Sequence, residues 1–135
     1  MKVMAIDYGD ARTGIAVSDA TGTIIGDAFV IAEQSQKALC VKITQEASAR
    51  FVCRIVVGYP KNMDGSAGSR AEKSAAFAER LRAACNIEVV LWDERLTTVS
   101  AHQILSDVGR YGKKRKKAVD AVAASLILEG YLAGL

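Results

Sequence analysis

Four carboxylates in this sequence lie where a folded chain could bring them to a metal ion. Asp7 ends the first strand-like run, and Asp93 and Glu94 end the last one. Asp120 lies near the start of an apolar helical segment, where a carboxylate is costly to desolvate unless a positive charge pairs with it. Mg²⁺ and Mn²⁺ prefer oxygen ligands, and two such ions roughly 4 Å apart can clamp phosphoryl oxygens. The pattern therefore indicates a divalent-cation site for phosphoryl chemistry.

Each of these acids also has a simpler explanation. Asp7 could cap a turn, and Asp120 could favour the positive N-terminal end of its helix. Glu94 could pair with Arg95. The single histidine, His102, leaves almost no material for a histidine metal site or a Ser-His-Asp triad. The joint pattern of strand-end acids and an acid on an apolar helix face favours the oxygen-ligated metal.

Positive side chains near these acids are candidates for contacts with substrate phosphates. We take six of them as substrate-binding candidates: Arg12, Lys61, Arg70, Lys113, Lys114 and Arg115. The glycine-containing loop before Arg70 leads into a helix, whose free backbone N–H groups can bind an anion. Two alternatives stay open, because Arg12 could pair with Asp10 or Asp19 and a short basic run such as 113–117 is usually a solvated loop.

The acids need a scaffold, and the apolar pattern predicts an α/β fold. Apolar runs bounded by glycine-containing turns predict strands at 2–7, 12–18, 23–31, 53–60 and 87–94, the last two buried on both faces. Helical spacing predicts helices at about 35–50, in the rear part of 63–86, from about 97 to 105, and at about 117–132. Tight turns make the first three strands antiparallel neighbours, whereas helical crossovers make the last two parallel. We expect a five-stranded mixed sheet with flanking helices.

The composition is that of one folded domain covering residues 1–135. Hydrophobic residues make up 50% and charged residues 24%, which excludes a disordered chain. No apolar run approaches the roughly 20 residues of a membrane span, and the N-terminus lacks a signal-peptide layout. We therefore expect a cytoplasmic protein with no membrane partner.

Four segments together resemble the YqgF/RuvX family of bacterial ribonuclease-H-like proteins. They are AIDYGDARTGIAVSD at 5–19, VVGYPKNMDGSAGSRA at 56–71, VVLWDERLTT at 89–98 and KKAVDAVAASLILEGYL at 116–132. The resemblance covers almost the whole chain in order. It implies a ribonuclease-H-like fold and a cytoplasmic nuclease that processes the 5′ end of precursor 16S ribosomal RNA.

The same resemblance implies a catalytic triad of Asp7, Glu94 and Asp120. Asp93 ranks second to Glu94, because it points to the opposite side if the strand continues through it. Aromatic residues are 6% of the chain, so base stacking should be a minor term and recognition of the backbone and shape of structured RNA fits better. The expected partners are precursor 16S rRNA, free or in ribosomal particles, with Mg²⁺ or Mn²⁺ as cofactor.

Three alternative functions stay open. A Holliday junction resolvase would cut branched DNA with the same metal chemistry, but it needs a dimer to cut two strands symmetrically. An actin-like ATPase needs two domains of this kind. A non-catalytic ribosome-assembly factor would keep the fold and bind RNA. The sequence does not distinguish a monomer from a homodimer, Mg²⁺ from Mn²⁺, or endonuclease from exonuclease action.

Overall fold

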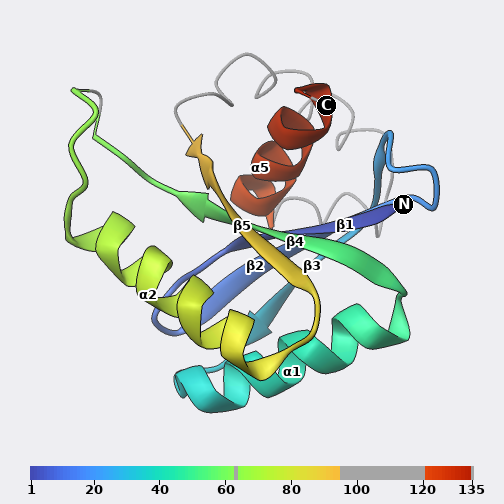
Figure 1. Cartoon of the computed structure of the whole chain (residues 1–135), viewed down its shortest axis with the longest axis horizontal. Coiled ribbons are helices and arrows are strands. Elements are labelled where there is room, and N and C mark those ends of the chain that lie inside the picture. Colours follow the sequence, from blue (N-terminus) through green and yellow to red (C-terminus); the bar gives the residue numbers. More distant parts are fainter. Residues whose placement is uncertain (63, 95–120, 135) are drawn as a thin grey trace.

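A computed structural model describes residues 1–62, 64–94 and 121–134 of the chain (Figure 1). The strands are β1 (Lys2–Asp7), β2 (Arg12–Ser18), β3 (Ile25–Ala32), β4 (Val52–Tyr59) and β5 (Glu88–Asp93). The helices are α1 (Gln36–Ala49), α2 (Ser69–Ala84) and α5 (Val122–Ala133). No helix within these ranges is long and apolar enough to cross a membrane.

The strands form one sheet in the order β3-β2-β1-β4-β5. β1 and β2 are antiparallel, as are β2 and β3, whereas β4 pairs in parallel with both β1 and β5. The turn between β2 and β3 contains Gly22 at a φ of 72°, a left-handed conformation that glycine adopts without a Cβ clash. The predicted mixed sheet of three antiparallel and two parallel strands is confirmed.

Helices α1 and α2 cover one face of the sheet, and α5 covers the other (Figure 1). Strand residues alternate between the two faces. Along β1, Met4 and Ile6 enter the core beneath α1 and α2, whereas Val3 and Ala5 enter the core beneath α5. The alternation places the side chain of Asp7 on the α5 face.

Two details differ from the sequence-based expectation. β4 is buried on both faces at Ile55, Val56 and Val57, as expected, but β5 is an edge strand and its Leu91 is 38% exposed. The prediction of a buried last strand was wrong, because an apolar run does not show whether a further strand pairs beside it. The predicted helix at about 97–105 and the start of the last helix at 117–120 lie outside the described residues.

Candidate active site

Asp7 is held at the end of β1 by its neighbours on both faces of the sheet. Within the sheet it pairs with Gly14 of β2, and its side chain lies on the α5 face. On the opposite face the next residue, Tyr8, stacks on Phe77 of α2 with ring centroids 4.5 Å apart. The Tyr8 hydroxyl accepts a hydrogen bond of 2.7 Å from the Gln36 amide of α1. These contacts fix the backbone beside Asp7, so its carboxylate projects from a rigid strand end.

Glu94 follows the last residue of β5 and lies on the same face as Asp7. Val90 and Trp92 pack against the core beneath α5, so alternation directs Asp93 to the other face. The Glu94 carboxyl lies over Gly58 of β4, where Oε2 is 3.2 Å from the position that a Cβ on this glycine would take. The structure thus brings Glu94 and Asp7 together across the intervening strand β4.

Burial and neighbouring charges change the pKa of both the Asp7 and the Glu94 carboxyl. Burial raises the pKa of Asp7 above its ordinary value of 3.8, and the guanidinium of Arg70 offsets part of this rise. Burial also raises the pKa of Glu94 above its ordinary value of 4.5, and the negative charge of Asp7 raises it further. Half-buried carboxyls that repel one another form a site that a divalent cation would stabilise in its ionised form.

Arg70 is a positive side chain that lies beside Asp7. Its Nη2 lies 4.0 Å from Asp7 Oδ1 and 3.5 Å from the Tyr8 carbonyl oxygen, to which it donates a hydrogen bond. The side chain is 66% exposed, so it can contact solvent or a ligand as well as Asp7. Arg70 was predicted as a phosphate ligand, and its position beside a candidate catalytic acid is compatible with that role.

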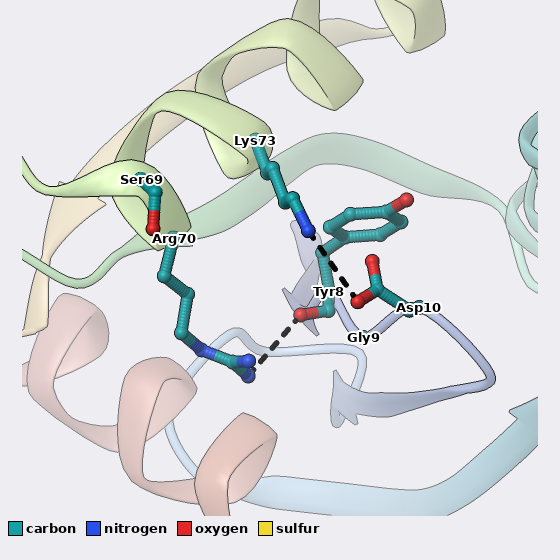
Figure 2. A pocket seen from close by; sticks show the side chains of 6 residues that line it. All are labelled: Tyr8, Gly9, Asp10, Ser69, Arg70 and Lys73. Atoms are coloured by element: carbon teal, nitrogen blue, oxygen red, sulfur yellow. Dashed lines mark hydrogen bonds and ion pairs between the residues drawn. The ribbon is translucent and has the colours of Figure 1, made fainter.

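A pocket of about 220 Å³ adjoins Arg70 at the start of α2 (Figure 2). Its lining residues are Tyr8, Gly9, Asp10, Ser69, Arg70 and Lys73. Figure 2 shows Arg70 reaching toward the Tyr8 carbonyl and Lys73 reaching toward Asp10, whose Oδ2 lies 3.6 Å from the ammonium. The pocket therefore contains two positive side chains, Arg70 close to Asp7 and Lys73 close to Asp10.

Sequence reasoning did not find Lys73, although a signal was present. Lys73 follows Arg70 by three residues on a predicted helix, and residues at this spacing lie on the same helical face. The role of Gly58 was also missed. Gly58 lies inside β4, where a glycine marks a close approach of other groups.

The remaining candidates lie farther along the same end of the sheet or outside the described residues. Arg12 is the exposed first residue of β2, and alternation places it on the same face as Gly14. Lys61 follows β4, with its Nζ 5.7 Å from the centroid of the Tyr59 ring. The candidates outside the described residues are Asp120, Lys113, Lys114 and Arg115.

The donor chemistry of the site suits a hard cation. The described residues contain no group of three or more His, Cys, Asp or Glu side chains that could hold a metal. They do contain the carboxyls of Asp7 and Glu94 on one face, which offer oxygen atoms only. Oxygen donors of this kind match Mg²⁺ and Mn²⁺ rather than Zn²⁺ or Cu²⁺, which favour imidazole and thiolate.

Sequence comparisons connect the chain with a group of bacterial proteins. A family model described as "RuvX: Holliday junction resolvase" matches residues 1–134. A protein of Halothermothrix orenii named "Putative pre-16S rRNA nuclease" is 45% identical over 133 residues, which cover 98% of this chain and 94% of that protein. A protein of Ruminiclostridium cellulolyticum with the same name is 39% identical over 133 residues, with the same coverage of both chains.

Structural comparisons identify the fold. RuvC of Thermus thermophilus in complex with a Holliday junction substrate superimposes with a TM-score of 0.62 at 12% identity, over 99% of this chain and 96% of RuvC. The Fowlpox virus resolvase bound to Holliday junction DNA gives 0.61 at 13% identity, over 99% and 98% of the two chains. The predicted ribonuclease-H-like fold is thereby confirmed.

Proposed function

Because the chain belongs to the RuvX family, whose members are nucleases, we propose that it is a metal-dependent hydrolase of phosphodiester bonds in structured RNA. The 5′ end of precursor 16S rRNA is the proposed substrate, as the names of its relatives indicate. The observation that carries the proposal is the meeting of Asp7 and Glu94 on one face of the sheet, with Arg70 beside them. A cytoplasmic location follows from this substrate.

The proposed metal ligands are Asp7, Glu94 and Asp120. Support for Asp120 comes from its bonded neighbour Ala121, which is buried at 2% exposure against β2. A Cβ added to Gly14 would lie 3.8 Å from the Cα of Ala121 and 3.7 Å from the Cβ of Asp7, so Ala121 and Asp7 are close to each other. Bound Mg²⁺ or Mn²⁺ supplies Lewis-acid stabilisation of the phosphoryl oxygens and lowers the pKa of water.

The chain's own residues position the reaction. The Tyr8 contacts hold the Asp7 backbone, so the carboxylate needs little reorganisation to bind its ligand. Arg70 offers two guanidinium donors toward a phosphate next to the acids, a geometry that suits phosphate oxygens. Arg12, Lys61 and the cations Lys113, Lys114 and Arg115 are proposed to contact the RNA backbone, which suits recognition by shape and charge.

A second candidate function is the resolution of branched DNA. It is favoured by the description of the family itself as Holliday junction resolvases. The same carboxylates would act, because the hydrolysed bond is again a phosphodiester. The two candidates differ in the substrate and in the need for two active sites.

A direct comparison of substrates tests the proposal. The purified protein is incubated with Mn²⁺ and either a labelled RNA containing the 5′ precursor region of 16S rRNA or a four-way DNA junction. Cleavage of the RNA that is lost in Asp7→Asn supports the proposal, whereas cleavage of the junction alone selects the resolvase. Binding of RNA without cleavage by the wild-type protein would indicate a non-catalytic assembly factor.

A further inference from the structure

The sheet order raises a geometric problem for the candidate active site. Asp7 ends β1 and Glu94 follows β5, but β4 lies between these two strands. A side chain on the α5 face of β4, at the level of the acids, would stand between them. The residue at this position is Gly58, which follows Val57, the partner of Ile6 in β1.

Gly58 is tightly enclosed on the α5 face. A Cβ added to it would lie 2.5 Å from Cδ1 of Ile127 in α5. The same Cβ would lie 3.1 Å from Cδ and 3.2 Å from Oε2 of Glu94. The space that a side chain would fill at this position is therefore occupied by the Glu94 carboxyl and the tip of Ile127.

Gly14 on the other side of Asp7 provides a contrast. It lies on the same face of the sheet and pairs directly with Asp7. A Cβ added to Gly14 would meet the Cβ of Ala124 at 3.4 Å and the Cβ of Asp7 at 3.7 Å, which are ordinary van der Waals distances. Two glycines thus flank the same acid, but among the described residues it is the one on β4 that leaves space used by another acid.

We propose that Gly58 is a positioning residue: the missing side chain opens a passage over β4 through which Glu94 reaches Asp7 to share a divalent cation. The cation in this inference rests on the proposed function, whereas the passage rests on the structure alone. Glutamate suits the position, because its additional methylene group extends the carboxyl back over the neighbouring strand. Gly58 acts through Glu94 and does not itself touch the substrate or the cation.

The test uses alanine variants and a packing control. In Gly58→Ala the new methyl group meets both Ile127 and Glu94, whereas in Gly58→Ala/Ile127→Val the Cδ1 clash is removed and the Glu94 clash stays. Gly14→Ala is the matched control on the same face. Mn²⁺ affinity is measured by isothermal titration calorimetry at a temperature at which thermal unfolding shows all variants folded, and the metal-free double variant is crystallised.

We expect the double variant to recover most of the thermal stability that Gly58→Ala loses. Its Mn²⁺ affinity should nevertheless stay about 10-fold or more below that of the wild type, which is the range seen when residues supporting metal ligands are changed. Gly14→Ala should keep its affinity within about 3-fold, because its new contacts are ordinary ones. The crystal structure of the double variant should show the Glu94 carboxyl displaced from Asp7.

Two results would overturn the role of Gly58. One is wild-type Mn²⁺ affinity in the double variant, which would reduce Gly58 to a packing partner of Ile127. The other is an unchanged Glu94 position in the crystal structure of that variant. If the wild-type protein binds no Mn²⁺, the proposed metal site fails, and the crystal structure alone then decides whether Gly58 positions Glu94.

Discussion

The two faces of the sheet are built from side chains of different size. Beneath α1 and α2 the strands contribute large residues such as Met4, Ile6 and Ile15, which belong to the same buried core as Phe77. Beneath α5 they contribute mainly alanine, valine and glycine, including Ala5 and Ala16. Large buried side chains supply most of the transfer free energy of folding. The comparison indicates that one face supplies stability, while the other allows α5 to approach closely and leaves space for the acids.

Neutralising an acid on the α5 face is the strongest test of the difference between the two faces. Asp7→Asn should lower the rate of RNA cleavage by at least about 10³-fold, or roughly 4 kcal/mol in barrier, because a proposed ligand to the cation is lost. Its stability without divalent cations should equal or exceed that of the wild type, since burial of the ionised carboxylate is unfavourable. Single-turnover cleavage and urea denaturation measure the two effects.

The matched control removes a negative charge from the opposite layer. Glu46 on α1 pairs with Arg50 at 3.0 Å and has a 42% exposed side chain. Glu46→Gln should leave the cleavage rate within about 2-fold of the wild type, because surface ion pairs contribute only about 0–1 kcal/mol to stability. Equal losses of activity in Asp7→Asn and Glu46→Gln would contradict the assignment of the site to the α5 face.

Truncation of a large side chain in the α1–α2 layer should, in contrast to Asp7→Asn, mainly lower the stability of the protein. Phe77→Ala removes a fully buried ring and should lower the free energy of unfolding by about 3–5 kcal/mol. Ile127→Val, on the buried side of α5, should cost only about 0.5–1.5 kcal/mol. Urea denaturation of the two variants checks the difference, and a loss for Ile127→Val as large as that for Phe77→Ala would remove the distinction between the faces.

Arg70 connects the two layers, since it begins on α2 and reaches the acid at the end of β1. Arg70→Ala should weaken RNA binding by about 10-fold, or roughly 1.4 kcal/mol, through loss of a phosphate contact. It should also move the acidic limb of the cleavage profile to higher pH, because the guanidinium lowers the pKa of both Asp7 and Glu94.

Arg80→Ala on the same helix is the control for Arg70→Ala. Arg80 is also exposed, and its substitution removes the same charge. It should leave the pH profile in place. Filter-binding and cleavage measurements between pH 5 and 9 compare the variants. A profile of Arg70→Ala identical to that of Arg80→Ala would show that Arg70 does not act on the acids.

The smallest expected effect is the pH dependence of stability without divalent cations. Folding raises the pKa of Asp7 and Glu94, so each carboxyl retains in the folded state a proton that the unfolded state has lost. The contribution of these groups to the free energy of unfolding should therefore fall as the pH rises from the ordinary values of 3.8 and 4.5 through the raised values, and stay constant above them.

Denaturation in the presence of a chelator measures this contribution. The double variant Asp7→Asn/Glu94→Gln should lack it, so the difference in stability between this variant and the wild type should grow over that pH window. Added Mn²⁺ should stabilise the wild type at neutral pH and leave the double variant unchanged, since only a bound cation contributes. A pH-independent difference would show that the two carboxyls titrate as they do in the unfolded chain.

Much of the fold was predictable from the sequence because its signals are local. Glycine-containing turns identified the antiparallel strands, and apolar runs placed Asp7 at the end of the first strand and Glu94 at the end of the last, one residue from the observed end of β5. The family resemblance implied Glu94, and strand alternation added that Asp93 points to the opposite side. The inferences about strands depend on the period of a strand, which a single sequence shows directly.

The geometry between elements was not predictable in the same way. Nothing local in the sequence shows that β4 separates β1 from β5, so the need for a glycine at position 58 was not evident. The stacking of Tyr8 on Phe77 also joins residues far apart in the chain. Such features depend on the order of strands in the sheet, which the three-dimensional structure provides.

The position of α5 has a consequence for biosynthesis. Ile127 closes the space over Gly58, and Ala124 lies against Gly14, so residues of α5 form one wall of the site around Asp7. Translation proceeds from the N-terminus, so α5 leaves the ribosome after every other described element. A nascent chain therefore carries the carboxylates of Asp7 and Glu94 without this wall, and the site around Asp7 is complete only after α5 has left the ribosome.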